Sequence, residues 1–416
     1  MKQRRVRWML AGGVLLLALL AAAGWIWHSS RATRILVATD IHYLSPALND
    51  HGACFEKTIL NGDGKAMEYI DELTDAFVEQ VIQEKPAALI LSGDLTLNGE
   101  EQSHLDLAQK LKRITDAGIP VLVLPGNHDL NSGNAVRFVG KTYERTDSLP
   151  SGQFDQVYAA FGYDQASSRD AASLSYVYPL NEQLWVLMVD VNVPGSEGTL
   201  LPETLDWVKT QLNQARQAGA QVLAVSHQNL LAHSEEISTG FVMGGAEELL
   251  ALYEEYGVLC NLSGHIHMQH TAQSETGFFE AATSSLAVSS NQYARVTLRP
   301  GRLTYQTVPV DVSGWAQKQG STDENLLNFS AYSEDFFRQV TRGKVIGWLQ
   351  KEENAEELAD FLAQVNLDYF QGRTDAYDRN APLFDAWEQA DSFYSGYMES
   401  MRRETAADYN RAEIRF

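Results

Sequence analysis

The stretch Arg34-Ile-Leu-Val-Ala-Thr-Asp-Ile-His42 decides the fold class, because an apolar run leads directly into Asp40 and His42. Short apolar runs closed by polar residues are typical of strands that are buried on both faces of a parallel sheet. Segments between such runs read as helices. The alternation predicts an α/β fold. The further strands are expected at 87–91, 121–124, 173–178, 184–191, 222–225 and 258–262, and helices at 74–84, 104–117 and 246–256.

The second part of the chain breaks this alternation. A hairpin is expected from 293–298 and 303–309, around Arg299-Pro-Gly301, and it makes the sheets mixed. Beyond Val312 the strand signals vanish, and segments 323–350, 355–371 and 383–409 read as helices. The sequence therefore predicts three parts: a signal anchor and spacer over 1–34, an α/β domain with mixed sheets flanked by helices over 35–311, and a C-terminal helical domain over 312–416.

The N-terminal part has the features of a membrane-targeting segment. Four basic residues precede the uncharged run 9–27, which would form a helix about 28 Å long, close to the thickness of a bilayer core. The basic cluster predicts a cytoplasmic N-terminus and an extracytoplasmic remainder. The length of the run favours a single-pass anchor in the cell membrane. The alternative is a signal peptide cleaved after the small residues 21–23, which would leave a secreted protein.

Charge and cysteine content exclude several classes of protein. The chain has 54 Asp and Glu against 32 Lys and Arg, and an acidic body repels long polyanions. We therefore expect no nucleic-acid polymer as a partner, and the sequence indicates no protein partner. With only Cys54 and Cys260, a disulfide scaffold and a cysteine-rich zinc module are excluded.

Five short motifs carry the chemistry, and each follows a predicted strand. Ligands of open α/β sheets bind at the carboxyl ends of strands, so the motifs should meet at one rim. In extended chain, residues i and i+2 point the same way, so Asp40 with His42, and His265 with His267, can each aim at one spot. Carboxylates, an amide and imidazoles form a mixed set that suits Mn, Fe, Zn or Co better than Ca or Mg. The motifs are DIH (40–42), GD (93–94), GNHD (126–129), SH (226–227) and GHIH (264–267).

This series, in this order, resembles the calcineurin-like metallophosphoesterases. The resemblance spans Asp40 to His267 and implies a sandwich of two sheets flanked by helices, with a site for two divalent or trivalent ions of Mn, Fe or Zn. It implies that Asp94 bridges both ions. It also implies that His128 faces the substrate as a general acid and, with Asn127, binds it. By the same resemblance, one ion is held by Asp40, His42 and His267, and the other by Asn127, His227 and His265.

The implied reaction is attack of a metal-bound hydroxide on a phosphodiester, with His128 protonating the leaving group. Two divalent ions, two carboxylates and one hydroxide leave a local charge of about +1, an anion trap within an acidic protein. Two positions depart from the family's pattern. Leu97 stands where many members have an Asp that supports the catalytic His, and Gln228 follows His227 in an SHQN stretch.

A finer resemblance concerns the substrate. TDIHYL, SGDLTLNGE and the helical C-terminus are similar to membrane-attached class III cyclic-nucleotide phosphodiesterases of Gram-positive bacteria. This implies a small phosphodiester substrate, with cyclic nucleotides first. Substrate preference drifts on one scaffold, so a phosphomonoesterase or nucleotidase, or a hydrolase of envelope phosphodiesters, remains an alternative on the same site. A non-catalytic envelope-binding protein is the alternative outside enzymes.

Other polar and aromatic residues near the motifs receive simpler interpretations. We expect surface positions for His104, His233 and His270, and a plain turn for Asn61-Gly-Asp-Gly64. Loop aromatics more often pack their own loop than bind a ligand, although a base could stack on one of them. The aromatics nearest the predicted rim are Tyr43, Phe55, Phe138, Tyr143 and Phe241.

Overall fold

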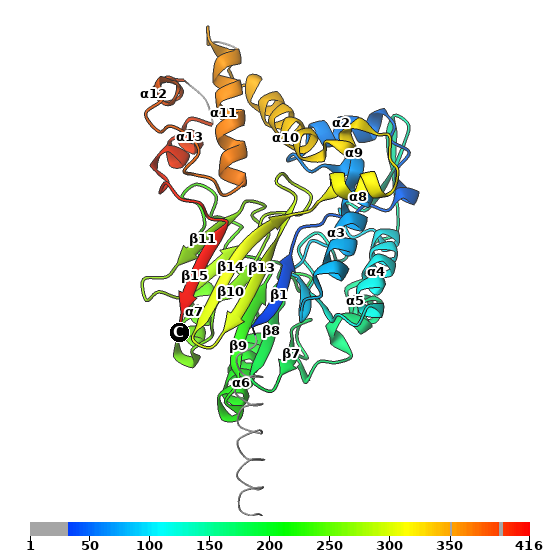
Figure 1. The fold of residues 1–416 in the computed structure, drawn as a ribbon, viewed down its shortest axis with the longest axis vertical. Coiled ribbons are helices and arrows are strands. Elements are labelled where there is room, and N and C mark those ends of the chain that lie inside the picture. Colours follow the sequence, from blue (N-terminus) through cyan, green and yellow to red (C-terminus); the bar gives the residue numbers. More distant parts are fainter. Residues whose placement is uncertain (1–31, 350–351, 391–393) are drawn as a thin grey trace, which may run out of the picture.

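The computed structural model describes residues 32–349, 352–390 and 394–416 (Figure 1). The predicted anchor at 9–27 lies outside the described residues. Within the described ranges, no helix has both the length and the apolar character needed to cross a bilayer.

The first sheet holds the strand that opens the α/β domain. Strand β1 runs parallel to β2 and antiparallel to β13, so the sheet is mixed as predicted. Its order is β15-β14-β13-β1-β2-β3. The strands are β1 (Thr33–Ala38), β2 (Ala88–Leu91), β3 (Val121–Val123), β13 (Gln292–Arg299), β14 (Arg302–Pro309) and β15 (Arg411–Arg415).

The second sheet is also mixed, with order β11-β12-β10-β9-β8-β7-β6. Its centre is parallel, because β8 pairs with β9, β9 with β10 and β10 with β12 in parallel register. The strands are β6 (Ser168–Arg169), β7 (Tyr176–Asn181), β8 (Leu184–Val189), β9 (Gln221–Ser226), β10 (Asn261–Ser263), β11 (His270–Gln273) and β12 (Phe279–Ala282).

The two sheets face each other across one apolar core and carry helices on their outer faces (Figure 1). Helices α3 (Ile70–Glu84) and α4 (Glu101–Asp116) cover the first sheet, and α6 (Pro202–Ala218) and α7 (Ala246–Tyr256) cover the second. Their buried faces carry the apolar residues that set the predicted helical spacing. The α/β sandwich flanked by helices is confirmed.

Short elements complete the α/β part of the chain and were not predicted from the sequence. They lie mostly in the long connections after β1 and β3. They are η1 (Pro46–Leu48), α2 (Ala53–Leu60), η2 (Met67–Tyr69), the hairpin β4 (Val136–Val139) and β5 (Thr142–Arg145), α5 (Ser151–Val157) and a turn of π-helix η3 (Ala159–Tyr163).

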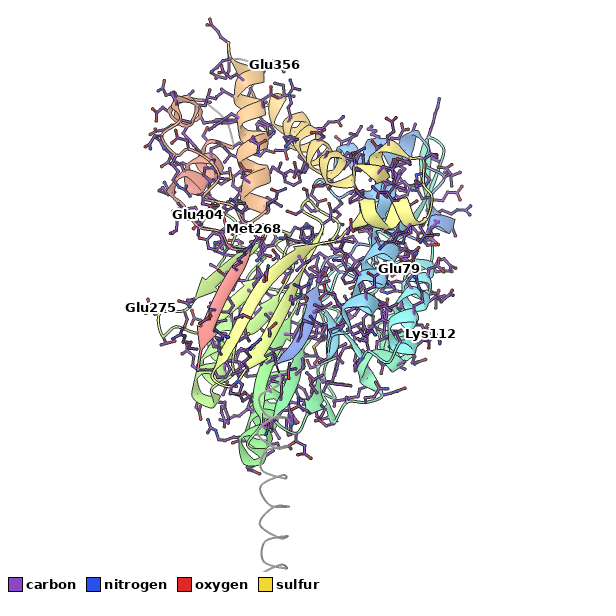
Figure 2. All side chains as sticks on the ribbon, in the orientation of Figure 1. Glu79, Lys112, Met268, Glu275, Glu356 and Glu404 are labelled. Atoms are coloured by element: carbon purple, nitrogen blue, oxygen red, sulfur yellow. The ribbon has the colours of Figure 1, made fainter. Side chains whose placement is uncertain are left out.

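The C-terminal helices lie beyond the carboxyl ends of the parallel strands (Figure 1). They pack onto the GHIH segment, since Ile266 and Met268 share a buried cluster with Leu358 and Trp387. Figure 2 shows Met268 at this junction. The helices are α8 (Val312–Lys318), α9 (Glu324–Leu327), α10 (Phe329–Ile346), α11 (Ala355–Phe370), α12 (Pro382–Gln389) and α13 (Tyr394–Arg403).

The last predicted helix, 383–409, is wrong in part. The chain forms α12 and α13 there, and it then returns to the first sheet as β15, which pairs antiparallel with β14. Alternating exposure along Arg411–Arg415 marks an edge strand with one solvent-facing side. The end of the chain therefore ties the C-terminal helices to the sandwich.

Candidate metal centre

All seven predicted ligands meet at the carboxyl ends of the central strands. The ligand atoms of the six Asp and His residues form two groups, each with all atoms within 4.8 Å of one another, and Oδ1 of Asn127 lies 3.1 Å from Nε2 of His227. Asp40, His42, Asp94 and His267 make one group, and Asp94, His227 and His265 make the other. Asp94 belongs to both groups.

The first half-site consists of Asp40, His42 and His267. The Nε2 atom of His267 lies 3.2 Å from Oδ1 of Asp40 and 3.0 Å from Nε2 of His42. The Asp40 and His42 side chains are fully buried, and that of His267 is 15% exposed. Two imidazole nitrogens and one carboxylate oxygen therefore point at one position.

The second half-site consists of Asn127, His227 and His265. Nε2 of His227 lies 3.1 Å from Oδ1 of Asn127 and 3.3 Å from Oδ1 of Asp94. The other ring nitrogen of His227 donates to the carbonyl of Ser92 at 2.9 Å. Nε2 of His265 donates to the carbonyl of Gly240 at 3.0 Å, which leaves Nδ1 of His265 as the free ligand atom.

Asp94 lies between the two half-sites. Its Oδ1 faces His227, and its Oδ2 lies 3.8 Å from Nε2 of His42. One carboxylate therefore presents an oxygen to each half-site, as a bridging ligand would.

The residues fit a pair of cations. Buried polar atoms are almost always hydrogen-bonded, yet Oδ1 of Asp40 and Nδ1 of His265 are buried with no hydrogen-bond partner among the described residues. Each of these atoms points into its own half-site, where a cation would satisfy it. The donor set of imidazole, carboxylate and amide is the one expected for a transition metal rather than Ca²⁺.

Carboxylates within the centre raise the pKa of two of its histidines. Burial lowers the pKa of His227, but Asp94 and Asp40 outweigh it and raise that pKa to about 9. For His267, the carboxylates of Asp40 and Asp63 outweigh burial and the charge of Lys65, and the pKa again rises to about 9. Carboxylates thus hold protons on these imidazoles, and metal binding would release them.

The local backbone is unusual at these ligands. Asp40, His42, Asp94, His265 and His267 all have positive φ, between 47° and 67°. This left-handed region is costly for residues other than glycine and persists at sites where the surrounding fold enforces it. The strand ends therefore turn sharply enough to direct successive side chains inward.

Two glycines let the backbones approach the ligands. A Cβ on Gly93 would lie 2.6 Å from Nδ1 of His227, and one on Gly264 would lie 2.5 Å from Oδ2 of Asp40. Both distances are below any van der Waals contact. Each half-site is therefore backed by a glycine that no larger residue can replace without displacing a ligand.

His128 lies at the mouth of the centre. Its backbone N–H donates to Oδ1 of Asp94 at 2.9 Å, and its Nε2 lies 4.0 Å from Oδ2 of the same residue. Its Nδ1 lies 2.9 Å from the carbonyl of Leu97 and 3.1 Å from Oδ1 of Asn98. The backbone of Leu97 thus supports the imidazole at the position where many family members use an Asp side chain.

His104, His233 and His270 are buried, so the prediction of surface positions for them was wrong. His104 lies between the carbonyl of Asp129 and the hydroxyl of Tyr158, both at 2.9 Å. His233 and His270 face each other at 3.0 Å between their Nδ1 atoms. These histidines brace the loops behind the centre.

Gln228 also has a structural partner. It exchanges two hydrogen bonds with the Asn192 side chain, at 2.7 and 3.0 Å, and both residues are buried. This pair joins the SHQN stretch to the loop after β8.

One residue at the centre was not predicted from the sequence. Asp63, in the segment read as a plain turn, has Oδ2 3.1 Å from Nδ1 of His267. The carboxylate comes from a loop far away in the sequence, and nothing in the local pattern distinguishes it from a turn residue.

Comparison with known families agrees with this geometry. The model of the calcineurin-like phosphoesterases matches residues 33–269, and the model of the C-terminal domain of cyclic nucleotide phosphodiesterase matches residues 311–408. No curated protein sequence matches the chain.

Three solved structures are similar to parts of this chain. A dimetal phosphatase from Danio rerio is 14% identical, with 66% of this chain and 95% of that chain covered and a TM-score of 0.48. A purple acid phosphatase from seeds of yellow lupin, Lupinus luteus, is 16% identical, with 68% and 52% covered and a TM-score of 0.45. GAP50, the anchor in the inner membrane complex of Plasmodium, is 12% identical, with 67% and 85% covered and a TM-score of 0.38.

Proposed function

Because this chain belongs to the calcineurin-like phosphoesterases, and is a metal-dependent phosphoester hydrolase, we propose that its substrates are small phosphodiesters, with cyclic nucleotides as the first candidates. The observation that carries the proposal is the shared Asp94 carboxylate between two half-sites, with the His128 ring beside it. The match of residues 311–408 to a phosphodiesterase C-terminal domain supports the choice of a diester.

The centre divides the work among its residues. Bound cations, which we propose to be Mn, Fe or Zn, would supply Lewis-acid stabilisation of the phosphoryl oxygens. Asp40, His42 and His267 would hold one cation, and Asn127, His227 and His265 the other. Asp94 keeps the two half-sites adjacent. Because the chain as a whole is acidic, a small anionic substrate would bind where the bound cations make the local charge positive.

His128 is placed to move a proton. Its Nδ1 is held by Leu97 and Asn98, so its Nε2 faces the centre. The His128 side chain is 36% exposed, whereas those of His42 and His227 are buried and that of His267 is 15% exposed. An imidazole in this position can protonate the departing oxygen, which matters most for a poor leaving group such as a ribose alkoxide.

Phe241 is the rim aromatic placed best to bind a base. Its ring centroid lies 5.0 Å from that of His265. By contrast, Tyr43, Phe55 and Phe138 are buried, and the Phe55 and Phe138 rings pack on each other. A base stacked on Phe241 would lie beside the second half-site, within reach of a phosphate held there.

We also propose that the run 9–27 anchors the protein in the cell membrane with the hydrolase outside, since this run has the length and flanking charges of a signal anchor. Protease added to intact cells should degrade the hydrolase, and the protein should stay with the membrane fraction. Release of the full activity into the medium would instead indicate signal cleavage.

Turnover of a cyclic nucleotide tests the proposed substrate. The full chain in detergent would be stripped of metal, reloaded with Mn²⁺ and given 3′,5′-cyclic AMP or bis(4-nitrophenyl) phosphate, with products followed by chromatography. Turnover of both substrates supports the proposal. Turnover of the nitrophenyl diester alone would keep the diester chemistry and overturn the cyclic nucleotide. A strong preference for monoesters would favour a phosphatase or nucleotidase.

A further inference from the structure

We propose that segment Asn61–Lys65, named here the Asp63 loop, is a positioning element for the first half-site. In this proposal, Asp63 orients His267 toward the metal position, and the C-terminal helix α10 holds the loop in place. The inference rests on the proposed metal centre and not on which phosphodiester is hydrolysed.

The His267 ring is held between two carboxylates. Its Nε2 lies 3.2 Å from Oδ1 of Asp40, and its Nδ1 lies 3.1 Å from Oδ2 of Asp63. A metal-binding histidine commonly donates its second N–H to a carboxylate, which fixes the ring orientation and makes the ligand nitrogen more basic. With its proton on Nδ1, His267 directs the lone pair of Nε2 into the first half-site.

Lys65 and the neighbouring backbone hold Asp63 in position. Nζ of Lys65 lies 2.7 Å from Oδ2 of Asp63, and the Lys65 side chain is only 11% exposed. The loop is also joined to the 287–288 segment, because Lys65 forms a β-bridge with Val288 and the N–H of Ala66 donates to the Ala287 carbonyl at 2.8 Å. The Asp63 carboxylate therefore has a matched charge and a fixed backbone beneath it.

The C-terminal helices complete the support. Phe337 of α10 packs directly on Gly64, which has φ +86° and where a Cβ would lie 2.5 Å from Cδ2 of Phe337. Phe337 is buried in a small cluster with Val288 and with Leu367 of α11. A continuous chain of contacts thus leads from α10 through Gly64 and Asp63 to the metal ligand His267. This gives the C-terminal helices a role at the centre without a ligand of their own.

Metal affinity is the direct test of Asp63. Mn²⁺ binding to metal-free Asp63→Asn and Asp63→Ala would be measured by competition with a fluorescent chelator. Loss of an outer partner of a metal-binding histidine typically weakens affinity by roughly 10–100-fold, and we expect this for one of the two ions, with the smaller loss in Asp63→Asn, which keeps an oxygen acceptor. Activity on bis(4-nitrophenyl) phosphate should recover at high Mn²⁺, which a misfolded variant would not show.

Glu68→Gln is the matched control for charge, because Glu68 is a carboxylate close in sequence that pairs with surface His51 instead. It should bind both ions as the unchanged protein does. Two Mn²⁺ ions bound to Asp63→Ala with unchanged affinities would overturn the proposal. Because the measurement needs no nucleotide, its result is separate from that of the cyclic AMP experiment.

A pair of adjacent phenylalanines tests the role of α10. Phe337→Leu removes the ring that packs on Gly64. Phe336→Leu instead removes the neighbouring ring, which stacks on Tyr332. Both changes should lower the melting temperature. Only Phe337→Leu should weaken Mn²⁺ binding, by several-fold, at temperatures where both variants are folded. Equal Mn²⁺ affinity in the two variants would show that α10 does not position the loop.

Discussion

The two half-sites of the metal centre differ in what orients their histidines. In the second half-site, His227 and His265 donate their outer N–H groups to the backbone carbonyls of Ser92 and Gly240. In the first, His267 faces the charged carboxylate of Asp63. Ser92 directly follows β2, so His227 is supported from the sandwich, while the first half-site depends on a loop held by the C-terminal helices.

A backbone carbonyl and a carboxylate affect a metal-binding imidazole differently. A backbone carbonyl fixes the ring but adds no charge, whereas a carboxylate also increases the electron density that the imidazole offers to a cation. We therefore expect the first half-site to bind its ion more tightly than the second. His128 lies beside that first half-site, since its ring centroid is 5.1 Å from that of His42. Four experiments can break or sharpen this contrast.

The largest effect is expected from Asp94→Asn, which acts on both half-sites at once. An amide turns one of the two oxygens into an N–H₂ donor, which repels a cation in the half-site that it faces. Turnover of bis(4-nitrophenyl) phosphate should fall at least roughly 1,000-fold, the upper range for loss of one electrostatic contact, and bound metal should fall below two ions per chain. Asp116→Asn, on the exposed side of α4, is the control. Retention of both activity and metal would remove Asp94 as the shared ligand.

His128→Ala should separate chemistry from metal binding. The imidazole is held by Leu97 and Asn98 and belongs to neither ligand group, so elemental analysis should find metal loading unchanged. Loss of a general acid costs roughly 100-fold or more when the leaving group is an alkoxide, and much less when it is a nitrophenolate. Rates on an alkyl diester and on bis(4-nitrophenyl) phosphate give the comparison. Equal losses on both substrates would rule out the acid role.

The two backing glycines offer a way to disturb one half-site at a time. Gly264→Ala drives a methyl group toward Asp40 in the first half-site, and Gly93→Ala drives one toward His227 in the second. Misplacement of a ligand by about 1 Å can cost up to 10²-fold in rate, and we expect losses of roughly 10- to 100-fold in each variant. Each should lose the ion of its own half-site, measured as metal per chain. Gly133→Ala, where the added Cβ meets nothing within 4 Å, should be neutral.

Much of the centre was predictable because its ligands follow strands whose order the apolar runs reveal. Asp40, Asp94 and His227 follow β1, β2 and β9, and parallel pairing brings these strand ends to one rim. The spacing argument for His265 and His267 was less accurate. Both have positive φ, so the chain is not extended there, and the two imidazoles enter different half-sites.

The supporting contacts could not be predicted, for physical reasons. Every residue has a backbone carbonyl, so no side-chain pattern indicates that the carbonyl of Leu97 will support His128. Asp63 reaches His267 only through the path of a long insertion, and Arg411–Arg415 is too polar to stand out as a strand. Local sequence specifies the ends of strands, while the partners of the ligands depend on tertiary packing.

The smallest expected effect is a difference in Mn²⁺ affinity between the two half-sites of the unchanged protein. If the carboxylate of Asp63 strengthens His267 as a ligand, the two Mn²⁺ ions should bind with affinities that differ by about 10-fold, the lower range for an outer carboxylate partner. Competition with a chelator would resolve two steps. His227→Ala should then remove the weaker step and His42→Ala the tighter one, because each deletes a ligand of a different half-site. The reverse assignment would mean that Asn127 and the Asp94 carboxylate outweigh Asp63, and that the shared ligand, rather than the outer support, sets the order of metal binding.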